Sequence, residues 1–361
     1  MTTSLSKPGL SLRPYQMQAH EAVVEGFKQF HKQLVVIPTG GGKTLLFASL
    51  AAHYAPERTL VLAHREELIN QAVDKIARAT GLQAEVEMGS SFASLEAPVV
   101  VGSVQTLMRE ARRSRFPLDH FGLVVVDEAH HCIAESYQST LREFGGCARV
   151  LGVTATSDRA DCKSLGRYFE NIAYEISLVD LIKQNWLSQI RVKTMPLSLD
   201  LRGVKTRAGD YSADDLGHAI EPYLERVADI MVEHKHRKTI VFLPLIRLSE
   251  EFAKMCRKRG IAAEHVDGQS PDRAERLARF SQGKTTLLSN AMLLTEGYDE
   301  PSVDCVVCLR PTKVRSLYTQ IVGRGTRLYP GKDHLLLLDF LWMTEEPVSY
   351  THLRAHETRE D

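Results

Sequence analysis

Short apolar segments recur along this chain, separated by longer segments with helical periodicity. In the first half, five apolar runs predict strands at residues 34–37, 59–63, 98–102, 123–126 and 150–153. In the second half, five more lie at residues 239–243, 262–266, 285–289, 303–309 and 335–339. The runs are rich in Val, Leu and Ile without polar alternation, which is typical of strands covered on both faces. Together with the intervening helices, they predict an α/β protein with parallel sheets.

The region between the two halves has a different composition. Residues 199–215 are polar and contain Gly203, Gly209 and the adjacent Asp214 and Asp215, which is typical of a connector. We therefore expect two doubly wound lobes, over residues 1–190 and 217–347, joined by a connector over residues 191–216. A chain of 361 residues is long enough for about two domains.

Composition narrows the class of protein. The hydrophobic content of 43% and charged content of 25% are ordinary for a soluble globular protein. No run of about 18 apolar residues occurs, and the N-terminus lacks the regions of a signal peptide. We therefore expect a cytoplasmic protein with reduced cysteines. Cys305 and Cys308 have the spacing of half a zinc site, but they lie in an apolar run without a second pair, so buried strand residues are the better interpretation.

Overall charge gives no argument for a polyanionic partner, because the formal net charge is zero. A local patch would be needed. The candidate is the run Arg109, Arg112, Arg113 and Arg115, for which a solvated helix end is an equally good interpretation.

Residues 38–44 read Pro-Thr-Gly-Gly-Gly-Lys-Thr, between an apolar run and a helical pattern. Glycines let backbone N–H groups converge on a phosphate, and the helix N-terminus adds positive charge there. We expect Lys43 to neutralise the β- and γ-phosphates and Thr44 to coordinate Mg²⁺. Ile37 stands where the strict P-loop pattern has its first Gly, so a glycine-rich turn without chemistry is the alternative. The expected phosphate-binding residues are Thr39, Gly40, Gly41, Gly42, Lys43 and Thr44.

The sequence Asp127-Glu128-Ala129-His130 follows the apolar run at residues 123–126. A P-loop ATPase needs an acidic group at a strand end beside its phosphate loop to hold Mg²⁺, and we assign this role to Asp127. Glu128 is the expected general base that activates water. His64 and His131 are candidate metal ligands, although hydrogen-bonding histidines are the preferred interpretation.

Residues 320–327 carry the most informative motif of the second half. Arg324 and Arg327 are three apart, so on a helical turn they would project from one face. We expect them to reach the γ-phosphate as arginine fingers when a cleft between the lobes closes. A basic turn on a solvated surface is the alternative.

The order of these motifs resembles the superfamily 2 helicases and translocases over nearly all of residues 10–340, and the Asp-Glu-Ala-His form resembles in particular RadD-like DNA-repair helicases and type III restriction helicase subunits. The resemblance implies two RecA-like lobes with the ATP site in the cleft between them. It implies an ATP-dependent helicase or translocase that acts on DNA with Mg²⁺, with repair or restriction proteins as partners. The alternatives are the motor subunit of a restriction system and an RNA-directed ATPase.

The resemblance also implies roles for further residues. Additional contacts to the nucleotide fall on Gln16, which would read adenine, and on Arg13, Gly297 and Asp299. The residues expected to couple hydrolysis to lobe movement are His130, Thr154, Thr156 and Gln320. Contacts to nucleic acid fall on Arg65, Ser103, Gln105, Thr106 and Thr295.

The C-terminus has a separate signature. Residues 348–358 resemble the translation of a transposase sequencing adapter, so we expect residues 348–361 to be an artefact tail. An ordinary polar tail is the alternative. On the first interpretation, the natural chain continues beyond residue 347.

Overall fold

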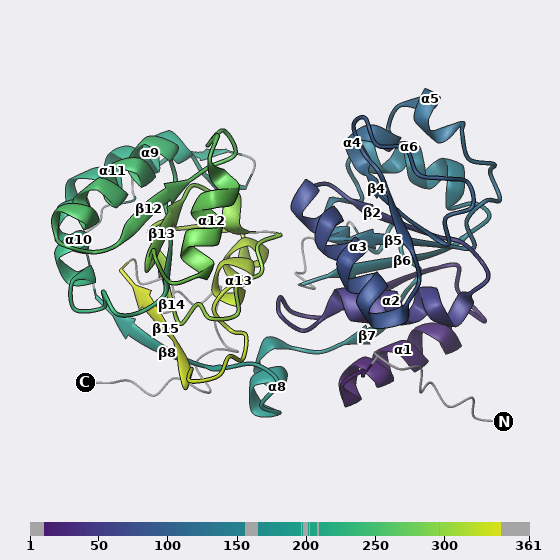
Figure 1. Cartoon of the computed structure of the whole chain (residues 1–361), viewed down its shortest axis with the longest axis horizontal. Helices are drawn as coiled ribbons and strands as arrows, with labels where there is room; N and C mark the ends of the chain where they lie inside the picture. Colours follow the sequence, from purple (N-terminus) through teal and green to yellow (C-terminus); the bar gives the residue numbers. More distant parts are fainter. Residues whose placement is uncertain are drawn as a thin grey trace. The chain divides into compact units, whose positions relative to one another are not determined.

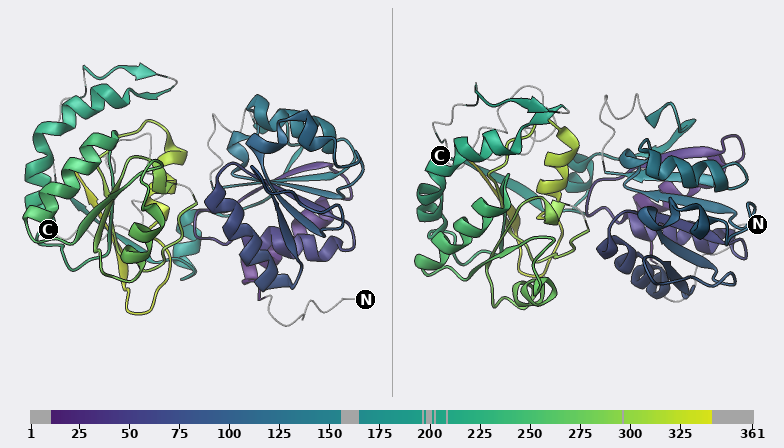
Figure 2. Two further views of the ribbon diagram at one scale, coloured as in Figure 1. Left: turned by 45° about the horizontal axis from the view of Figure 1, so that its top comes forward. Right: turned by 90° about the horizontal axis from the view of Figure 1, so that it is seen from above.

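The computed structural model describes residues 11–155, 165–195, 197, 201, 203–207, 209–295 and 297–340. The chain divides into two compact units, Met1–Ser177 and Leu178–Asp361, each built around its own sheet (Figures 1 and 2). Thr156 and the expected artefact tail at residues 348–361 lie outside the described residues. Within the described part, no helix is both long enough and apolar enough to cross a membrane.

The first unit contains seven parallel strands in the order β3-β4-β2-β5-β6-β1-β7. The strands are β1 (Lys32–Val36), β2 (Thr59–Ala63), β3 (Ala84–Glu87), β4 (Val99–Ser103), β5 (Leu123–Asp127), β6 (Arg149–Thr154) and β7 (Asn171–Glu175). The helices are α1 (Pro14–Gly26), α2 (Lys43–Tyr54), α3 (Glu66–Thr80), α4 (Val104–Leu107), α5 (Glu110–Arg113), α6 (Glu135–Phe144) and the 3₁₀ turn η1 (Ala129–His131).

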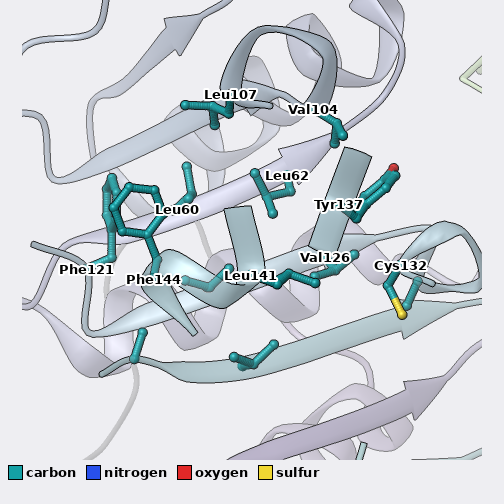
Figure 3. Packing of buried hydrophobic residues seen from close by; sticks show 14 of the residues in the cluster. Leu60, Leu62, Val104, Leu107, Phe121, Val126, Cys132, Tyr137, Leu141 and Phe144 are labelled. Atoms are coloured by element: carbon teal, nitrogen blue, oxygen red, sulfur yellow. The ribbon is translucent and has the colours of Figure 1, made fainter. Parts of the chain in front are cut away.

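An apolar cluster packs one face of this sheet against its helices (Figure 3). Leu60 and Leu62 project from β2, and Tyr137, Leu141 and Phe144 project from α6, all nearly inaccessible to water. The three α6 residues recur at helical spacing, so they form the single apolar stripe that a surface helix buries. This packing fixes β5 and its neighbours, whose carboxyl ends carry the candidate chemistry.

The second unit contains six parallel strands in the order β12-β13-β11-β14-β15-β8. The strands are β8 (Gln189–Thr194), β11 (Thr239–Phe242), β12 (Ala263–Val266), β13 (Leu287–Asn290), β14 (Cys305–Cys308) and β15 (His334–Asp339), beside an antiparallel hairpin of β9 (Thr206–Arg207) and β10 (Asp210–Tyr211). The helices are α8 (Leu178–Lys183), α9 (Ala213–Ile220), α10 (Leu224–Met231), α11 (Ile246–Lys258), α12 (Arg273–Ser281) and α13 (Arg315–Gly323), with the 3₁₀ turns η2 (Glu221–Tyr223) and η3 (Leu293–Thr295).

All ten predicted strands are present, and the two parallel sheets confirm the predicted fold class. Cys305 and Cys308 are buried in β14 with free thiols, as the strand interpretation predicted. The predicted lobe limits differ from the observed units. Residues 178–190 were assigned to the first lobe and residues 191–216 to a connector, but α8 belongs to the second unit and β8 pairs with β15.

The segment expected to be a connector is also tied into the second unit. The Asp210 carboxylate of β10 accepts hydrogen bonds from the Thr312 hydroxyl and the Lys313 N–H, both at 2.9 Å. The hairpin therefore packs against the loop that leads into α13.

Candidate active site

The phosphate loop lies at the carboxyl edge of the first sheet, between β1 and α2. Its Gly40 and Gly42 have φ values of 83° and 80°, in the left-handed region that glycine adopts at little cost. Gly42 is the N-cap of α2, so the loop meets the positive end of that helix. The Ile37 N–H donates to the Thr154 carbonyl at 3.0 Å, which fixes the loop to β6.

Helix α1 holds the same loop from the other side. The Gln16 Nε2 group donates to the carbonyls of Gly41 (3.1 Å) and Gly42 (3.3 Å), and the Tyr15 hydroxyl donates to Gly41 (2.7 Å). Gln16 Oε1 accepts the Arg13 backbone N–H at 2.9 Å, which caps α1. Gln16 is 1% exposed, so its observed contacts fix the loop, and the expected reading of adenine remains a prediction.

Tyr15 was not among the expected site residues. Its hydroxyl accepts from Arg13 Nη1 at 3.2 Å and donates to the loop. The sequence signal was present, because Tyr15 directly precedes Gln16, but a buried tyrosine in a helix is more often read as core.

Lys43, Asp127 and Glu128 come together at this edge. Asp127 ends β5 and accepts the Glu128 N–H at 3.0 Å, and Lys43 Nζ lies 3.5 Å from Glu128 Oε1. Glu128 has a φ of 49°, a conformation that costs energy for a residue with a Cβ. Burial, reinforced by the negative charge of Glu128, raises the pKa of Asp127 well above its usual range, against the opposing effect of Lys43.

These residues fit a magnesium nucleotide. A buried carboxylate whose charged form is disfavoured gains from a nearby divalent cation, and Asp127 supplies the oxygen ligand that Mg²⁺ prefers. The Thr39 hydroxyl is buried and has no hydrogen-bond partner among the described residues, so the loop can offer another polar group to a phosphate.

A short chain of polar contacts connects β6 with the acidic pair. Thr154 Oγ1 lies 3.5 Å from His130 Nδ1, which in turn lies 3.6 Å from Glu128 Oε2. His64 and His131 pack edge to face at 4.6 Å, and His64 Nδ1 lies 3.4 Å from the Tyr137 hydroxyl. The structure thus brings Thr154 and His130, two of the residues expected to couple hydrolysis to movement, together beside Glu128, and their coupling role stays a prediction.

Four of the five residues expected to contact nucleic acid lie at the ends of two adjacent strands. β2 and β4 pair so that Ala63 is opposite Ser103, and Arg65 is the N-cap of α3. Ser103 is nearly buried and donates to Gln105 Oε1 at 2.9 Å, while exposed Gln105 donates to the His64 carbonyl at 3.0 Å. Thr106, also nearly buried, accepts the Gly89 N–H at 3.1 Å.

The arginine run does not form a free basic patch. Arg112 and Arg115 both pair with Glu87, which is fully buried, and Arg113 pairs with Glu143. Three of the four guanidinium groups therefore form ion pairs within the first unit. For these three arginines, the alternative prediction of a solvated helix end is also wrong. The long separation of Glu87 from the arginines in sequence hid this network.

In the second unit, the two motif arginines differ from the expected arrangement. Helix α13 ends at Gly323, before both of them. Arg324 is 5% exposed, and its guanidinium donates to the carbonyls of Tyr298 (2.5 Å) and Thr295 (2.7 Å). Arg327 pairs with Asp299, and burial lowers the pKa of Arg327. Arg324 thus contacts Thr295 and Tyr298, and Arg327 contacts Asp299, rather than both projecting from one helical face, because the chain has left the helix.

The remaining expected residues of this unit lie around the same segment. Gln320 is buried in α13, and Gly297 has a φ of 75°. Thr295 is 1% exposed and its hydroxyl donates to the Met292 carbonyl at 2.7 Å, so the second unit by itself does not present it to a ligand. Lys332, which the sequence did not single out, donates to the carbonyls of Gly325 (2.5 Å) and Arg327 (2.7 Å) and so holds the turn.

Comparison with known protein families agrees with this architecture. Residues 9–159 match the family described as "Type III restriction enzyme, res subunit", and residues 222–329 match "Helicase conserved C-terminal domain". This chain belongs to the superfamily 2 helicases and translocases. Two curated relatives are proteins assigned as the ATP-dependent helicase IRC3. The Saccharomyces cerevisiae protein is 33% identical over 91% of this chain and 51% of its own length. The Schizosaccharomyces pombe protein, named as mitochondrial, is 34% identical over 94% of this chain and 59% of its own length.

A solved structure supports the fold. A fragment assigned as the HsdR subunit of a type I restriction enzyme from Vibrio vulnificus superposes with a TM-score of 0.72 and 24% identity, covering 91% of this chain and 64% of that one. This chain spans 51% and 59% of the lengths of the two curated relatives.

Proposed function

We propose that this chain is an ATP-dependent helicase or translocase that acts on DNA. The observation that carries the proposal is the meeting of Lys43, Asp127 and Glu128 beside a left-handed glycine loop at the carboxyl edge of a parallel sheet. The proposal is supported by the nucleotide use that the helicase family implies and by both curated relatives, which are named as ATP-dependent helicases.

In this proposal, the phosphate loop binds the triphosphate through the backbone N–H groups of residues 39–44, and Lys43 offsets charge on the β- and γ-phosphates. Thr44 and Asp127 would hold Mg²⁺, which supplies positive charge to the phosphate oxygens. Glu128 takes a proton from the attacking water as the general base. The contacts from Glu128 through His130 to Thr154 would couple ATP hydrolysis at Glu128 to the conformation of β6.

Arg324 and Arg327 would stabilise the charge on the transferred phosphate. In the second unit, their guanidinium groups are held by the Thr295 and Tyr298 carbonyls and by Asp299. Delivery to a phosphate would therefore exchange these partners for phosphate oxygens. The nucleotide state and the conformation around Thr295, Tyr298 and Asp299 would be linked in this way.

The nucleic-acid site would lie at the ends of β2 and β4, where Arg65, Ser103, Gln105 and Thr106 gather. Contacts of this type bind phosphate and sugar and carry no base sequence information. We therefore expect low sequence specificity and an affinity that falls steeply with salt. A cytoplasmic location is part of the proposal, although the Schizosaccharomyces pombe relative is named as mitochondrial.

A motor subunit of a restriction system is the second candidate. It is favoured by the family description of residues 9–159 and by a 25% identical Escherichia coli relative named as a type I restriction endonuclease subunit. The two candidates share the same ATP chemistry and differ in whether a nuclease accompanies the motor.

The experiment that tests the proposed site measures ATP binding and turnover in Lys43→Ala and Glu128→Gln. Lys43→Ala should lose turnover, since the backbone alone cannot supply the missing positive charge. Glu128→Gln should still bind ATP and turn it over at least ~100-fold more slowly. The matched controls are Lys28→Ala and Glu110→Gln, because both residues are exposed on the first unit. Near-normal turnover in either site variant would contradict the assignment.

A further inference from the structure

A large aromatic ring is exposed on the loop that connects β3 with β4. Phe92 is 59% exposed, and the guanidinium carbon of Arg112 lies 3.9 Å from its ring centroid, with that of Arg115 at 4.9 Å. Stacking by a guanidinium covers part of an aromatic ring and restricts its orientation. Phe92 therefore presents an apolar, planar surface against two guanidinium groups, whose charge Glu87 offsets in part.

The loop under this ring is held by buried charge. Glu87 has no exposed side-chain surface, and its carboxylate pairs with Arg112 and Arg115 and accepts the Ala93 N–H at 2.8 Å. Arg112 also donates to the carbonyls of Gly89 and Ser91, both at 2.6 Å. A loop fixed in this way has already lost its conformational freedom, so binding through it costs less entropy.

The same loop is joined to the proposed nucleic-acid site. The Gly89 N–H donates to Thr106 Oγ1 at 3.1 Å, and the Arg112 guanidinium connects Gly89 with the Phe92 ring. Three successive contacts, through Gly89 and Arg112, therefore connect Thr106 with Phe92. A strand whose backbone passes residues 103–106 would have a nucleobase within reach of the ring.

We propose that Phe92 is a stacking platform for one nucleobase of a single strand bound to the first unit. This inference rests on the proposed function, because it requires that the chain bind nucleic acid. Stacking uses the flat face that every base has, so the platform would add affinity without sequence preference. The two guanidinium groups against the ring share the single carboxylate of Glu87, and the remaining positive charge favours a polyanionic strand over an apolar protein surface.

The test combines substitutions of Phe92 with removal of the bases from the bound oligonucleotide. Binding of a short single-stranded thymidine oligonucleotide is compared with binding of the same strand made abasic, at one salt concentration, by fluorescence anisotropy. Phe92→Ala should weaken binding of the normal strand by about five-fold or more and leave binding of the abasic strand unchanged. Phe92→Trp should retain affinity, whereas Phe92→Leu should behave like the Ala variant because it lacks a planar ring.

Leu118→Ala is the matched control, because Leu118 is 60% exposed on the same unit. This substitution should leave the affinities for both strands unchanged. An unaltered affinity in Phe92→Ala, an equal loss on both strands, or full affinity in Phe92→Leu would overturn the inference while leaving the proposed function intact. A wild-type chain that binds neither strand would refute the proposed function, and the inference with it. Amide hydrogen exchange in β1 and β5 checks that each variant is folded.

Discussion

Substitution of Gly42 by alanine tests how tightly helix α1 and the phosphate loop are fitted together. An added Cβ at this position would come 2.3 Å from Gln16 Nε2, and the backbone there has a φ of +80°. The variant therefore suffers two separate penalties, one from the backbone and one from the displaced amide.

The two penalties can be estimated separately. A residue with a Cβ in the left-handed region costs about 1–2 kcal/mol. Displacing Gln16 breaks its hydrogen bonds to the Gly41 and Gly42 carbonyls, at about 0.5–1.5 kcal/mol each. The free energy of unfolding of the first unit should therefore fall by about 2–5 kcal/mol.

Gly81→Ala is the matched control, since Gly81 has a φ of +73° and nothing within 4 Å of an added Cβ. It should lose only the backbone penalty. The slowest-exchanging amides of β1 and β5 report the unfolding free energy of this unit. In a Gln16→Ala background, Gly42→Ala should cost no more than Gly81→Ala. Equal losses for Gly42→Ala and Gly81→Ala in the wild-type background would refute the fitted arrangement.

Three further variants test other parts of the first unit. Glu87→Gln breaks a buried ion-pair network and should lower the free energy of unfolding by about 3–5 kcal/mol. Glu143 is partly exposed, so Glu143→Gln should lower it by only about 0–1 kcal/mol. Equal losses for the two variants, measured by the same amide exchange, would contradict this. Thr154→Val removes the contact with His130 and should lower the kcat of DNA-stimulated ATP hydrolysis by about two- to thirty-fold at unchanged ATP affinity, and an unchanged kcat would rule out the coupling role. The pKa of Asp127 is raised to about 6 in the folded chain, so between about pH 4 and pH 6 the folded carboxyl holds a proton that the unfolded one has released. The free energy of unfolding should therefore fall as pH rises from about 4 to about 6, and Asp127→Asn should abolish that component, as pH titration of the two proteins would show.

The sequence predicted the central strands and the edge strand β12 but missed the other three edge strands of the two sheets. Strands such as β5 and β14 are buried on both faces, so they read as continuous apolar runs. β3, β7 and β8 lie at sheet edges, where part of each strand faces water and polar residues alternate with apolar ones. An apolar run cannot mark such a strand, and this is why β8 was assigned across the end of a lobe and the start of a connector.

The candidate site shows the same division between local and long-range information. The acidic pair and the glycine loop could be predicted because each is a short motif at a strand end, and parallel strands bring those ends to one edge. The partners of Arg324 could not, because they depend on where α13 ends and on a loop about 30 residues earlier. Glu87 likewise gave no signal, since a glutamate in a short polar strand that also contains Glu85 is ordinary until Arg112 and Arg115 fold against it.

The most direct test of the central claim is the steady-state rate of ATP hydrolysis by the full chain as single-stranded DNA is added, with Glu128→Gln measured in parallel. If the chain is a nucleic-acid-dependent motor, the rate should rise to saturation with DNA concentration, and the midpoint should shift to higher DNA concentration as salt rises from ~50 to ~200 mM. Glu128→Gln should show no such rise. A wild-type rate that does not change when single-stranded DNA, duplex DNA or RNA is added would contradict the account.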